Sequence, residues 1–187
     1  ADPRAVEQLR AWMESLRRAH EYASALLLDA EGRLRLTAPA EAWDGPAHLA
    51  QDAMRILARG EPEMLDFGRD QDGEIHLAVL APLYSPDTSR RPLGVILLRI
   101  DPALYLYPYL QRWPIESQSA ETSLVRREGD ELVFLNPLRF HPDAALNLRL
   151  PLERRDLLAV RGVLGERGMI EAFDDRSRPV AGAVRPV

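Results

Sequence analysis

The order of secondary-structure signals in this chain is repeated. The charged, glycine-containing residues 29–33 lie between two short apolar runs, and residues 126–130 do so again in the second half of the chain. Such turn sequences between apolar runs are typical of β-hairpins. Each hairpin is followed by a proline (Pro39 or Pro137), a helical pattern, a glycine and an apolar strand. The repeat therefore predicts two modules with the same order of hairpin, helix and strand.

The two copies differ in length. The first has one further strand at residues 93–100, which is apolar on both faces and is therefore predicted to be central in its sheet. The second copy stops where that strand should begin, so we expect a fragment of a longer polypeptide whose second module lacks its last strand. Helices are predicted at residues 46–59 and 152–164. Short connections favour antiparallel pairing, and the predicted fold class is α+β, with helices flanking antiparallel sheets.

A long helix is predicted at the N-terminus. Asp2 is a good N-cap and Pro3 fits the first helical position. Apolar residues then recur at helical spacing at Val6, Leu9, Met13 and Leu16. The helix is expected to run to about Tyr22, a length of about 30 Å. Two interpretations stay open: a helix that packs on the core, or a stalk that also pairs with a second subunit.

Three segments are expected along the chain. Residues 1–22 form the N-terminal stalk helix, residues 23–113 the first module with a short connector helix, and residues 114–187 the second module. The connector contains a cluster of aromatic residues: Tyr105, Tyr107, Tyr109 and Trp113. The polar segment that begins the last range marks the expected boundary between the modules.

Composition excludes several classes of function. The net charge is −5, and the 24 positive charges are all arginines spread along the chain, so nothing predicts nucleic-acid binding. Cysteine is absent, which rules out disulfides and thiolate chemistry. The four histidines lack metal-ligand spacing, and neither a nucleophile elbow nor a phosphate-binding glycine loop is present. The sequence contains no run of 18 apolar residues and therefore predicts no membrane-spanning helix. We therefore expect no metal, no cofactor and no catalysis in this fragment.

Five residues are candidates for contact with a ligand: His76, Tyr84, Tyr107, Arg112 and Trp113. His76 interrupts an apolar strand and is either a half-buried, hydrogen-bonded histidine or a donor that lines a pocket. Tyr84 follows the end of that strand, and it either forms the rim of a pocket or packs at the edge of the sheet. Tyr107 belongs to the aromatic connector. Arg112 and Trp113 either clamp a ligand or have structural roles, with Trp113 packed between the modules and Arg112 solvated.

Other polar groups are more simply explained by loop and turn chemistry. Asn136, Arg139 and His141 either bind an anion or cap the loop after the second hairpin. Two carboxylate pairs lie in predicted turns: Asp70 with Asp72, and Asp174 with Asp175. Aspartate is favoured in turns because its side chain hydrogen-bonds to the nearby backbone, and we interpret both pairs in this way.

Three stretches of the second half resemble a known family. Residues 113–130, residues 133–139 and residues 172–187 are similar to the tandem Cache domains, the last stretch through its acidic turn, short strand and Arg-Pro-Val ending. Cache domains are PAS-like extracytoplasmic sensor domains of bacterial transmembrane signalling receptors. The resemblance covers nearly the whole chain. It implies two PAS-like modules, the first distal to the membrane and the second proximal.

The resemblance also implies a function in signal transduction. A small-molecule ligand would bind the concave face of the distal sheet, which points to His76, Tyr84 and the aromatic connector. This part of the protein would be periplasmic, with a membrane anchor elsewhere and a homodimer formed through the N-terminal helix. The output module would be a histidine kinase, a diguanylate cyclase (GGDEF) or phosphodiesterase, or a chemoreceptor. The alternative is a module without a pocket, which dimerises or binds a partner protein.

The family's amino-acid-binding members carry a spaced set of Tyr, Arg, Trp and Asp residues in the distal module. This sequence departs from that set, because only Arg112 and Trp113 match part of it. The resemblance therefore leaves the chemical class of the ligand open.

Overall fold

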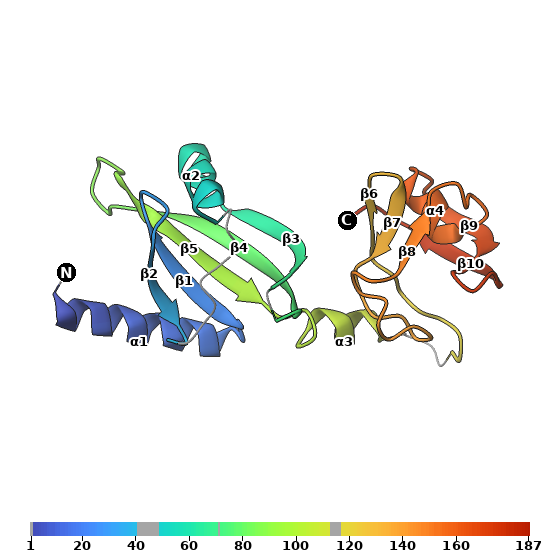
Figure 1. Ribbon diagram of the computed structural model, residues 1–187, viewed down its shortest axis with the longest axis horizontal. Coiled ribbons are helices and arrows are strands. Elements are labelled where there is room, and N and C mark those ends of the chain that lie inside the picture. Colours follow the sequence, from blue (N-terminus) through green and yellow to red (C-terminus); the bar gives the residue numbers. More distant parts are fainter. Residues whose placement is uncertain (1, 41–48, 71, 113–116) are drawn as a thin grey trace. The chain divides into compact units, whose positions relative to one another are not determined.

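The computed structural model describes most of the chain, namely residues 2–40, 49–70, 72–112 and 117–187 (Figure 1). The chain divides into two compact units, Ala1–Tyr105 and Leu106–Val187. Both units combine helices with antiparallel strands, which confirms the predicted α+β class. In the described ranges, no helix is both long enough and apolar enough to cross a lipid bilayer.

The first unit contains a five-stranded antiparallel sheet with the spatial order β2-β1-β5-β4-β3 (Figure 1). Its strands are β1 (Ser24–Asp29), β2 (Leu34–Ala38), β3 (Glu63–Arg69), β4 (Ile75–Tyr84) and β5 (Pro92–Ile100). The last of them, β5, pairs with β1 on one side and with β4 on the other. It therefore lies at the centre of the sheet, as its two apolar faces predict.

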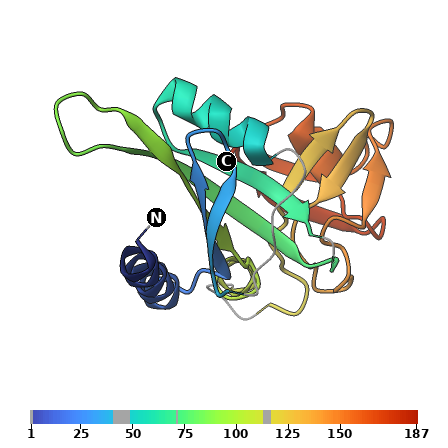
Figure 2. The same cartoon turned by 60° about the vertical axis from the view of Figure 1, so that its left-hand side comes forward.

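Helices α1 (Pro3–Ala19) and α2 (Leu49–Arg59) cover opposite faces of this sheet (Figure 2). Side chains alternate between the faces along each strand. The larger core lies under α2 and consists of Leu26, Leu28, Leu49, Ala53, Ile56, Ala78, Leu80, Val95 and Leu97. The smaller core lies under α1 and joins Met13 to Ala25, Leu36 and Ala38. The sheet is thus apolar on both faces, but α2 covers the larger core.

The boundaries of both helices follow their sequence signals. The Asp2 side chain accepts a hydrogen bond from the backbone N–H of Arg4 at 3.0 Å, and Pro3 is the first residue of α1. α1 ends at Ala19, slightly before the expected Tyr22. α2 accounts for residues 49–59 of its predicted range, and the first residues of that range lie outside the described residues.

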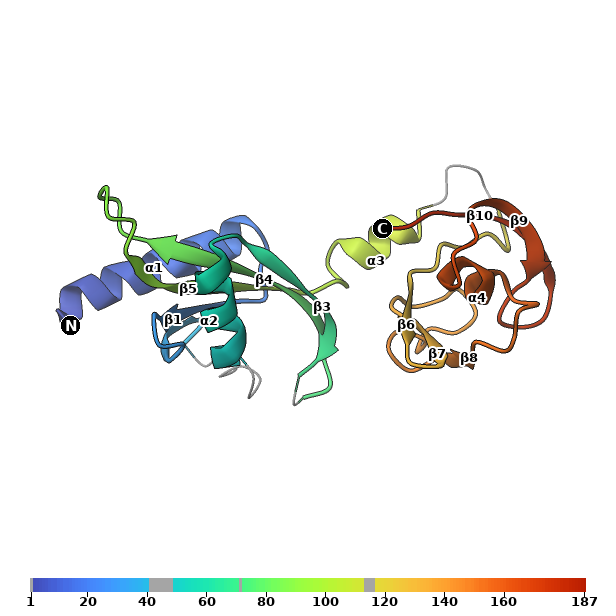
Figure 3. The ribbon, with the colours of Figure 1, turned by 90° about the horizontal axis from the view of Figure 1, so that it is seen from above.

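In its described residues, the second unit contains two separate antiparallel sheets and two short helices, α3 (Leu106–Leu110) and α4 (Leu158–Val163). One sheet has the order β6-β7-β8, formed by β6 (Val125–Glu128), β7 (Glu131–Phe134) and β8 (Arg149–Pro151). The other is the hairpin of β9 (Gly168–Phe173) and β10 (Pro179–Val184). Figure 3 shows α4 between the two sheets. Its residue Val160 is fully buried, in a core with Leu132, Phe134 and Leu157.

The predicted helix at residues 152–164 is wrong in its first half, because α4 begins only at Leu158. The residues before it form turns, in which the backbone N–H of Leu157 donates to the carbonyl of Arg154 at 3.0 Å. Leu157 itself is extended, buried and paired with Phe173 in an isolated parallel bridge. This pairing with β9 excludes the helical conformation that the apolar periodicity predicts.

The two units differ at one corresponding place in their sheets. In the first unit, β5 pairs with both β1 and β4. In the second unit, the strands that correspond by chain order to β1 and β4 are β6 and β10. Among the described residues, β6 pairs only with β7, and β10 pairs only with β9. The hairpin β9–β10 is therefore held to the rest of its unit by α4 and by loops, without a sheet ladder.

Gly94 allows β5 to lie close to β1. Its φ is +157°, and a Cβ atom there would lie 2.0 Å from the carbonyl oxygen of Leu28. We expect Gly94→Ala to lower the free energy of unfolding by about 3 kcal/mol or more, because it adds a backbone clash to an unfavourable φ. Urea denaturation measures this loss.

Gly73 is the matched control, because its φ is +85° and a Cβ atom added there would have no neighbour within 4 Å. Gly73→Ala should therefore cost only the left-handed backbone penalty, about 1 kcal/mol. Equal losses for the two variants would show that the close approach of β5 to β1 does not constrain the sheet.

Candidate functional site

A polar cluster continues the α2-facing side of the first sheet beyond its apolar core. Ser24 of β1 lies directly opposite Arg99 of β5, which in turn lies opposite Ala78 of β4. His76 is two residues before Ala78 and therefore shares its face. Asp70, in the turn between β3 and β4, contacts Arg99. We refer to Ser24, Asp70, His76 and Arg99 as the polar cluster.

The centre of the cluster is a buried ion pair. The guanidinium of Arg99 donates to the carboxylate of Asp70, and their side chains are only 13% and 4% exposed. The other oxygen of Asp70 accepts the backbone N–H groups of Asp72 at 3.0 Å and Glu74 at 2.8 Å. Asp70 thus closes its turn, as the sequence predicts, and also anchors a charge on the central strand.

The surroundings shift the pKa values of both titratable groups. Burial of Asp70 disfavours its charged form, but the N–H of Glu74 and the Arg99 guanidinium outweigh burial, so the pKa of the carboxyl lies below its usual value. Burial, followed by the nearby charge of Arg99, lowers the pKa of His76. His76 is therefore neutral at pH 7, and one of its ring nitrogens can accept a hydrogen bond while the other donates.

Ser24 adds a hydroxyl group with unused hydrogen-bonding capacity. The residue is 4% exposed, and its Oγ has no hydrogen-bond partner among the described residues. A buried hydroxyl without a partner costs free energy in the folded protein. Directly opposite residues in a sheet have Cβ atoms about 5 Å apart, so the hydroxyl lies next to Arg99. The cluster thus combines a cation, an anion, a neutral imidazole and a buried hydroxyl at one end of the α2-facing side of the sheet.

The structure places His76 in this cluster but Tyr84 elsewhere. Tyr84 is eight residues further along β4, which corresponds to roughly 26 Å. Its hydroxyl donates to the backbone carbonyl of Leu57 in α2 at 3.3 Å. The guanidinium of Arg90 lies over its ring, 5.2 Å from the centroid. Tyr84 thus attaches the end of α2 to the sheet, at the opposite end from His76.

The other predicted site residues belong to the second unit or lie outside the described residues. Tyr107 is buried in α3, and its hydroxyl donates to the backbone carbonyl of Leu135 at 2.9 Å. Arg112 is exposed, and Trp113 lies outside the described residues. Asn136 caps its loop, because its side-chain oxygen accepts the backbone N–H of Leu124 at 2.6 Å.

Three members of the cluster are not among the ligand contacts that the sequence predicts: Ser24, Asp70 and Arg99. Arg99 has a recognisable signal, since it is the one charged residue in the apolar strand 93–100 and shares the face of Leu97. Asp70 has a turn signal, but its contact with Arg99 depends on strand order. Ser24 has no sequence signal, because its importance arises only from its position opposite Arg99.

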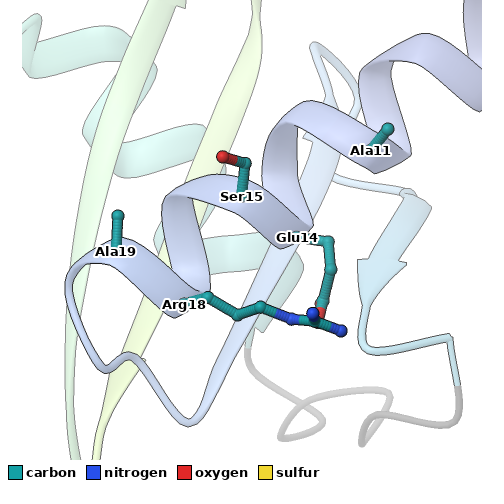
Figure 4. Close-up of a pocket in the computed structure, with 5 residues that line it drawn as sticks. All are labelled: Ala11, Glu14, Ser15, Arg18 and Ala19. Atoms are coloured by element: carbon teal, nitrogen blue, oxygen red, sulfur yellow. The ribbon is translucent and has the colours of Figure 1, made fainter.

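A shallow depression lies on the surface of α1 (Figure 4). It is lined by Ala11, Glu14, Ser15, Arg18 and Ala19, which all belong to this one helix. Glu14 is held by ion pairs with Arg17 and Arg18, and hydrogen bonds from these two guanidinium groups lower the pKa of its carboxyl to about 2. A surface formed by a single helix with its charges already paired has no enclosed volume for a ligand.

Comparison with solved structures identifies the fold. The ligand-binding domain of Mlp24, solved with asparagine, has a TM-score of 0.56 and 12% identity, over 93% of this chain and 67% of that chain. The ligand-binding domain of the Pseudomonas fluorescens chemoreceptor CtaA, solved with L-serine, has a TM-score of 0.55 and 13% identity. The match covers 93% of this chain and 69% of the CtaA domain. An extracellular ligand-binding receptor from Desulfohalobium retbaense has a TM-score of 0.53 and 14% identity. The match covers 91% of this chain and 31% of the receptor chain.

These similarities confirm, at the level of the fold, the resemblance to Cache-like extracytoplasmic sensor domains. No protein-family model matches the sequence. No curated protein matches it either. The chain spans 40% of one similar solved chain, a histidine kinase sensor domain, and 31% of the Desulfohalobium receptor.

The buried ion pair can be tested by removing its carboxylate. We expect Asp70→Ala to lower the free energy of unfolding by about 3–5 kcal/mol, because the buried Arg99 charge loses this counter-charge. Asp72→Ala, in the same turn but at an exposed side chain, should change it by less than about 0.5 kcal/mol. Urea denaturation of both variants checks this, and similar losses would contradict a specific role of the Asp70–Arg99 pair.

Proposed function

We propose that this chain is the extracytoplasmic ligand-sensing part of a bacterial membrane receptor and that it has no catalytic activity of its own. The fold that it shares with receptor ligand-binding domains supports the general role. The observation that carries the proposal is the polar cluster, in which Ser24 presents a buried, unsatisfied hydroxyl beside the charged pair of Asp70 and Arg99. A small ligand bound beside Arg99 would supply the hydrogen-bond partner that the Ser24 hydroxyl lacks among the described residues.

The chemistry of the cluster favours a small polar ligand that carries a carboxylate. An arginine beside a serine hydroxyl suits a carboxylate group, which accepts charge-assisted hydrogen bonds. Asp70 balances the charge of Arg99, so a ligand that also carries an ammonium group would fit as well as a simple anion. The structures of Mlp24 and CtaA contain the amino acids asparagine and L-serine. We therefore propose amino acids and small carboxylic acids as the first classes to test, with His76 as a further contact.

The competing proposal is a module without a ligand, which dimerises or binds a partner protein. The two proposals differ in one simple observable. A ligand that binds only the folded state raises the melting temperature by mass action. A broad panel of amino acids, small carboxylic acids and other metabolites should contain at least one compound that raises it. No response across the panel would favour the module without a ligand.

Ser24→Ala tests whether such a ligand uses the polar cluster. Since the Ser24 hydroxyl has no partner among the described residues, its removal leaves no buried group unpaired and should not lower stability. Loss of one hydrogen bond to the ligand should raise Kd about three- to tenfold, measured by calorimetric titration. Ser15→Ala, at an exposed position of α1, is the control and should bind as the wild type does. An unchanged Kd for Ser24→Ala would place the ligand elsewhere.

We further propose that α1 forms a homodimer in the full-length receptor. Five of its residues follow the alternating spacing of four and three that is typical of coiled-coil contacts: Ala5, Leu9, Trp12, Leu16 and Ala19. Trp12 is 52% exposed and Leu9 is 37% exposed, which is unusual for large apolar side chains on one stripe. Met13, by contrast, faces the sheet and is fully buried. The stripe therefore remains open to a second copy of the helix.

The dimer proposal predicts a selective effect of charge on this stripe. Trp12→Asp should raise the dimer dissociation constant at least about tenfold, because a carboxylate would enter an apolar helix contact. Ala11→Asp introduces the same charge at an exposed position in the depression of Figure 4, and it should have little effect. Sedimentation equilibrium measures both. Weakening by Ala11→Asp alone would move the contact to the other side of α1.

The remaining parts of the proposal concern the whole receptor. Binding would favour one of two arrangements of the sensor, and α1 would pass the change toward the membrane. The output module would be a histidine kinase, a diguanylate cyclase or phosphodiesterase, or a chemoreceptor. The flanking gene sequence tests this directly. Absence of encoded transmembrane helices on either side would contradict a membrane receptor.

A further inference from the structure

The hairpin β9–β10 of the second unit is apolar on both of its faces. On the inner face Ile170 is 5% exposed, and α4 packs closely, with the Leu158 side chain against Gly182. On the outer face, three cross-strand pairs have exposed side chains. These pairs are Met169 with Ala183, Glu171 with Ala181, and Phe173 with Pro179. We refer to these six residues as the hairpin patch, in which Glu171 is the single charged residue.

The other sheet of the same unit has a polar outer face. On β6–β7–β8, the face opposite α4 carries four charged residues, Arg126, Glu128, Glu131 and Arg149. Their side chains form a network of ion pairs, in which Arg149 contacts both Glu128 and Glu131. An antiparallel sheet that keeps one face in water is expected to be polar on that face. The hairpin patch departs from this pattern, because five of its six side chains are apolar.

The hairpin holds this patch in place before any partner binds. The carboxylate of Asp174 closes the turn, because it accepts the backbone N–H groups of Arg176 at 2.9 Å and Arg178 at 2.8 Å. Arg154, outside the hairpin, donates to the Ser177 hydroxyl at 3.2 Å. The turn and the inner face are therefore both fixed within the unit. A preformed surface loses little conformational entropy when it binds.

Two opposite charges on this face are too far apart to pair within one chain. Arg185 directly follows β10, and the alternation of side chains places it on the side of Ala181. Glu171 lies opposite Ala181, so four residues of β10, roughly 13 Å, separate it from Arg185. Neither side chain has an ion-pair partner within the part of the chain that the structure describes. Arg167, at the start of the hairpin, donates to two backbone carbonyls instead.

We propose that the hairpin patch is a contact between two copies of this chain, stacked face to face about a two-fold axis. The pair of Met169 and Ala183 lies at the axis, against the same pair of the other copy. Because the strands of the two copies run in opposite directions, Glu171 of each copy comes beside Arg185 of the other. Stacked sheets lie about 10 Å apart, which a glutamate and an arginine side chain together can span. The arrangement covers the apolar side chains and forms the ion pair twice.

The exposure of the patch and its size set the strength of this contact. Met169 is 75% exposed and Phe173 is 41% exposed, and large apolar side chains grouped on one face mark contact with another molecule. One face of a two-stranded hairpin is a small interface, so the complex is weak and transient. In a receptor held together elsewhere, such a contact is strengthened by the high effective concentration of the second copy. The contact depends neither on α1 nor on a ligand in the first unit.

NMR spectra of the intact labelled chain, recorded over a range of protein concentrations, test this contact. All samples carry Trp12→Asp, which removes the α1 contact. The amide signals of residues 169–173 should shift with concentration, with a Kd of roughly 0.1–1 mM. Met169→Asp should raise this Kd at least about tenfold, because it places a carboxylate in the apolar centre of the contact. The spectra also show whether each variant is folded.

A charge exchange tests the two-fold arrangement. Glu171→Arg and Arg185→Glu should each raise Kd about three- to tenfold, because each brings like charges together at two places. The double variant should restore the Kd of the Trp12→Asp chain. Glu153→Arg makes the same change of charge at an exposed residue outside the hairpin, and it should leave Kd unchanged.

Three outcomes would overturn the proposal. Spectra of the Trp12→Asp chain that do not change with concentration would leave the patch to a partner other than a second copy. A double variant as weak as the single variants would exclude the pairing of Glu171 with Arg185. Equal weakening by Glu153→Arg would show a general effect of charge. A failure of the α1 dimer leaves this test intact, because every sample lacks the α1 contact.

Discussion

The pairing of β5 with both β1 and β4 is the constraint on which the first unit depends. β5 is the last strand of this unit in sequence, but it lies between β1 and β4 in the sheet. This position requires a glycine at residue 94, because a Cβ atom there would clash with the carbonyl oxygen of Leu28. This insertion buries the apolar faces of β5 and brings Arg99 opposite Ser24. The same constraint therefore builds the core and assembles the polar cluster from parts of the chain that are distant in sequence.

The polar cluster costs stability that the apolar core must offset. Burying a guanidinium and a carboxylate removes both from water, and their attraction only partly compensates for this. The turn amides that hold Asp70 reduce the cost, and they also fix the position of the carboxylate. Ser24 adds a buried hydroxyl without a partner in the described residues. The apolar packing under α2 therefore has to compensate for the buried polar groups on the same face of the sheet.

Much of the fold could be predicted from the sequence because its signals are local. The hairpin turns, the N-cap at Asp2 and the apolar strand β5 each depend on a few neighbouring residues. The sequence of β3 gives no such signal, since it is an edge strand in which no residue is fully buried. The start of α4 depends on the pairing of Leu157 with Phe173. Of the site, His76 and Arg99 each interrupt an apolar strand and have a sequence signal, and His76 is among the predicted ligand contacts. Ser24 and Asp70 acquire their positions from strand order.

The proposed binding of a small polar ligand at the polar cluster of the first unit can be tested on the intact chain. The experiment is chemical-shift mapping of the isotopically labelled chain with amino acids and small carboxylic acids. We predict that a bound compound shifts the backbone amide signals of Ser24, His76 and Arg99, with smaller changes at Tyr84 at the far end of β4. Shifts confined to α1 or to the second unit would contradict binding at the polar cluster and would place the ligand on a different surface of this chain.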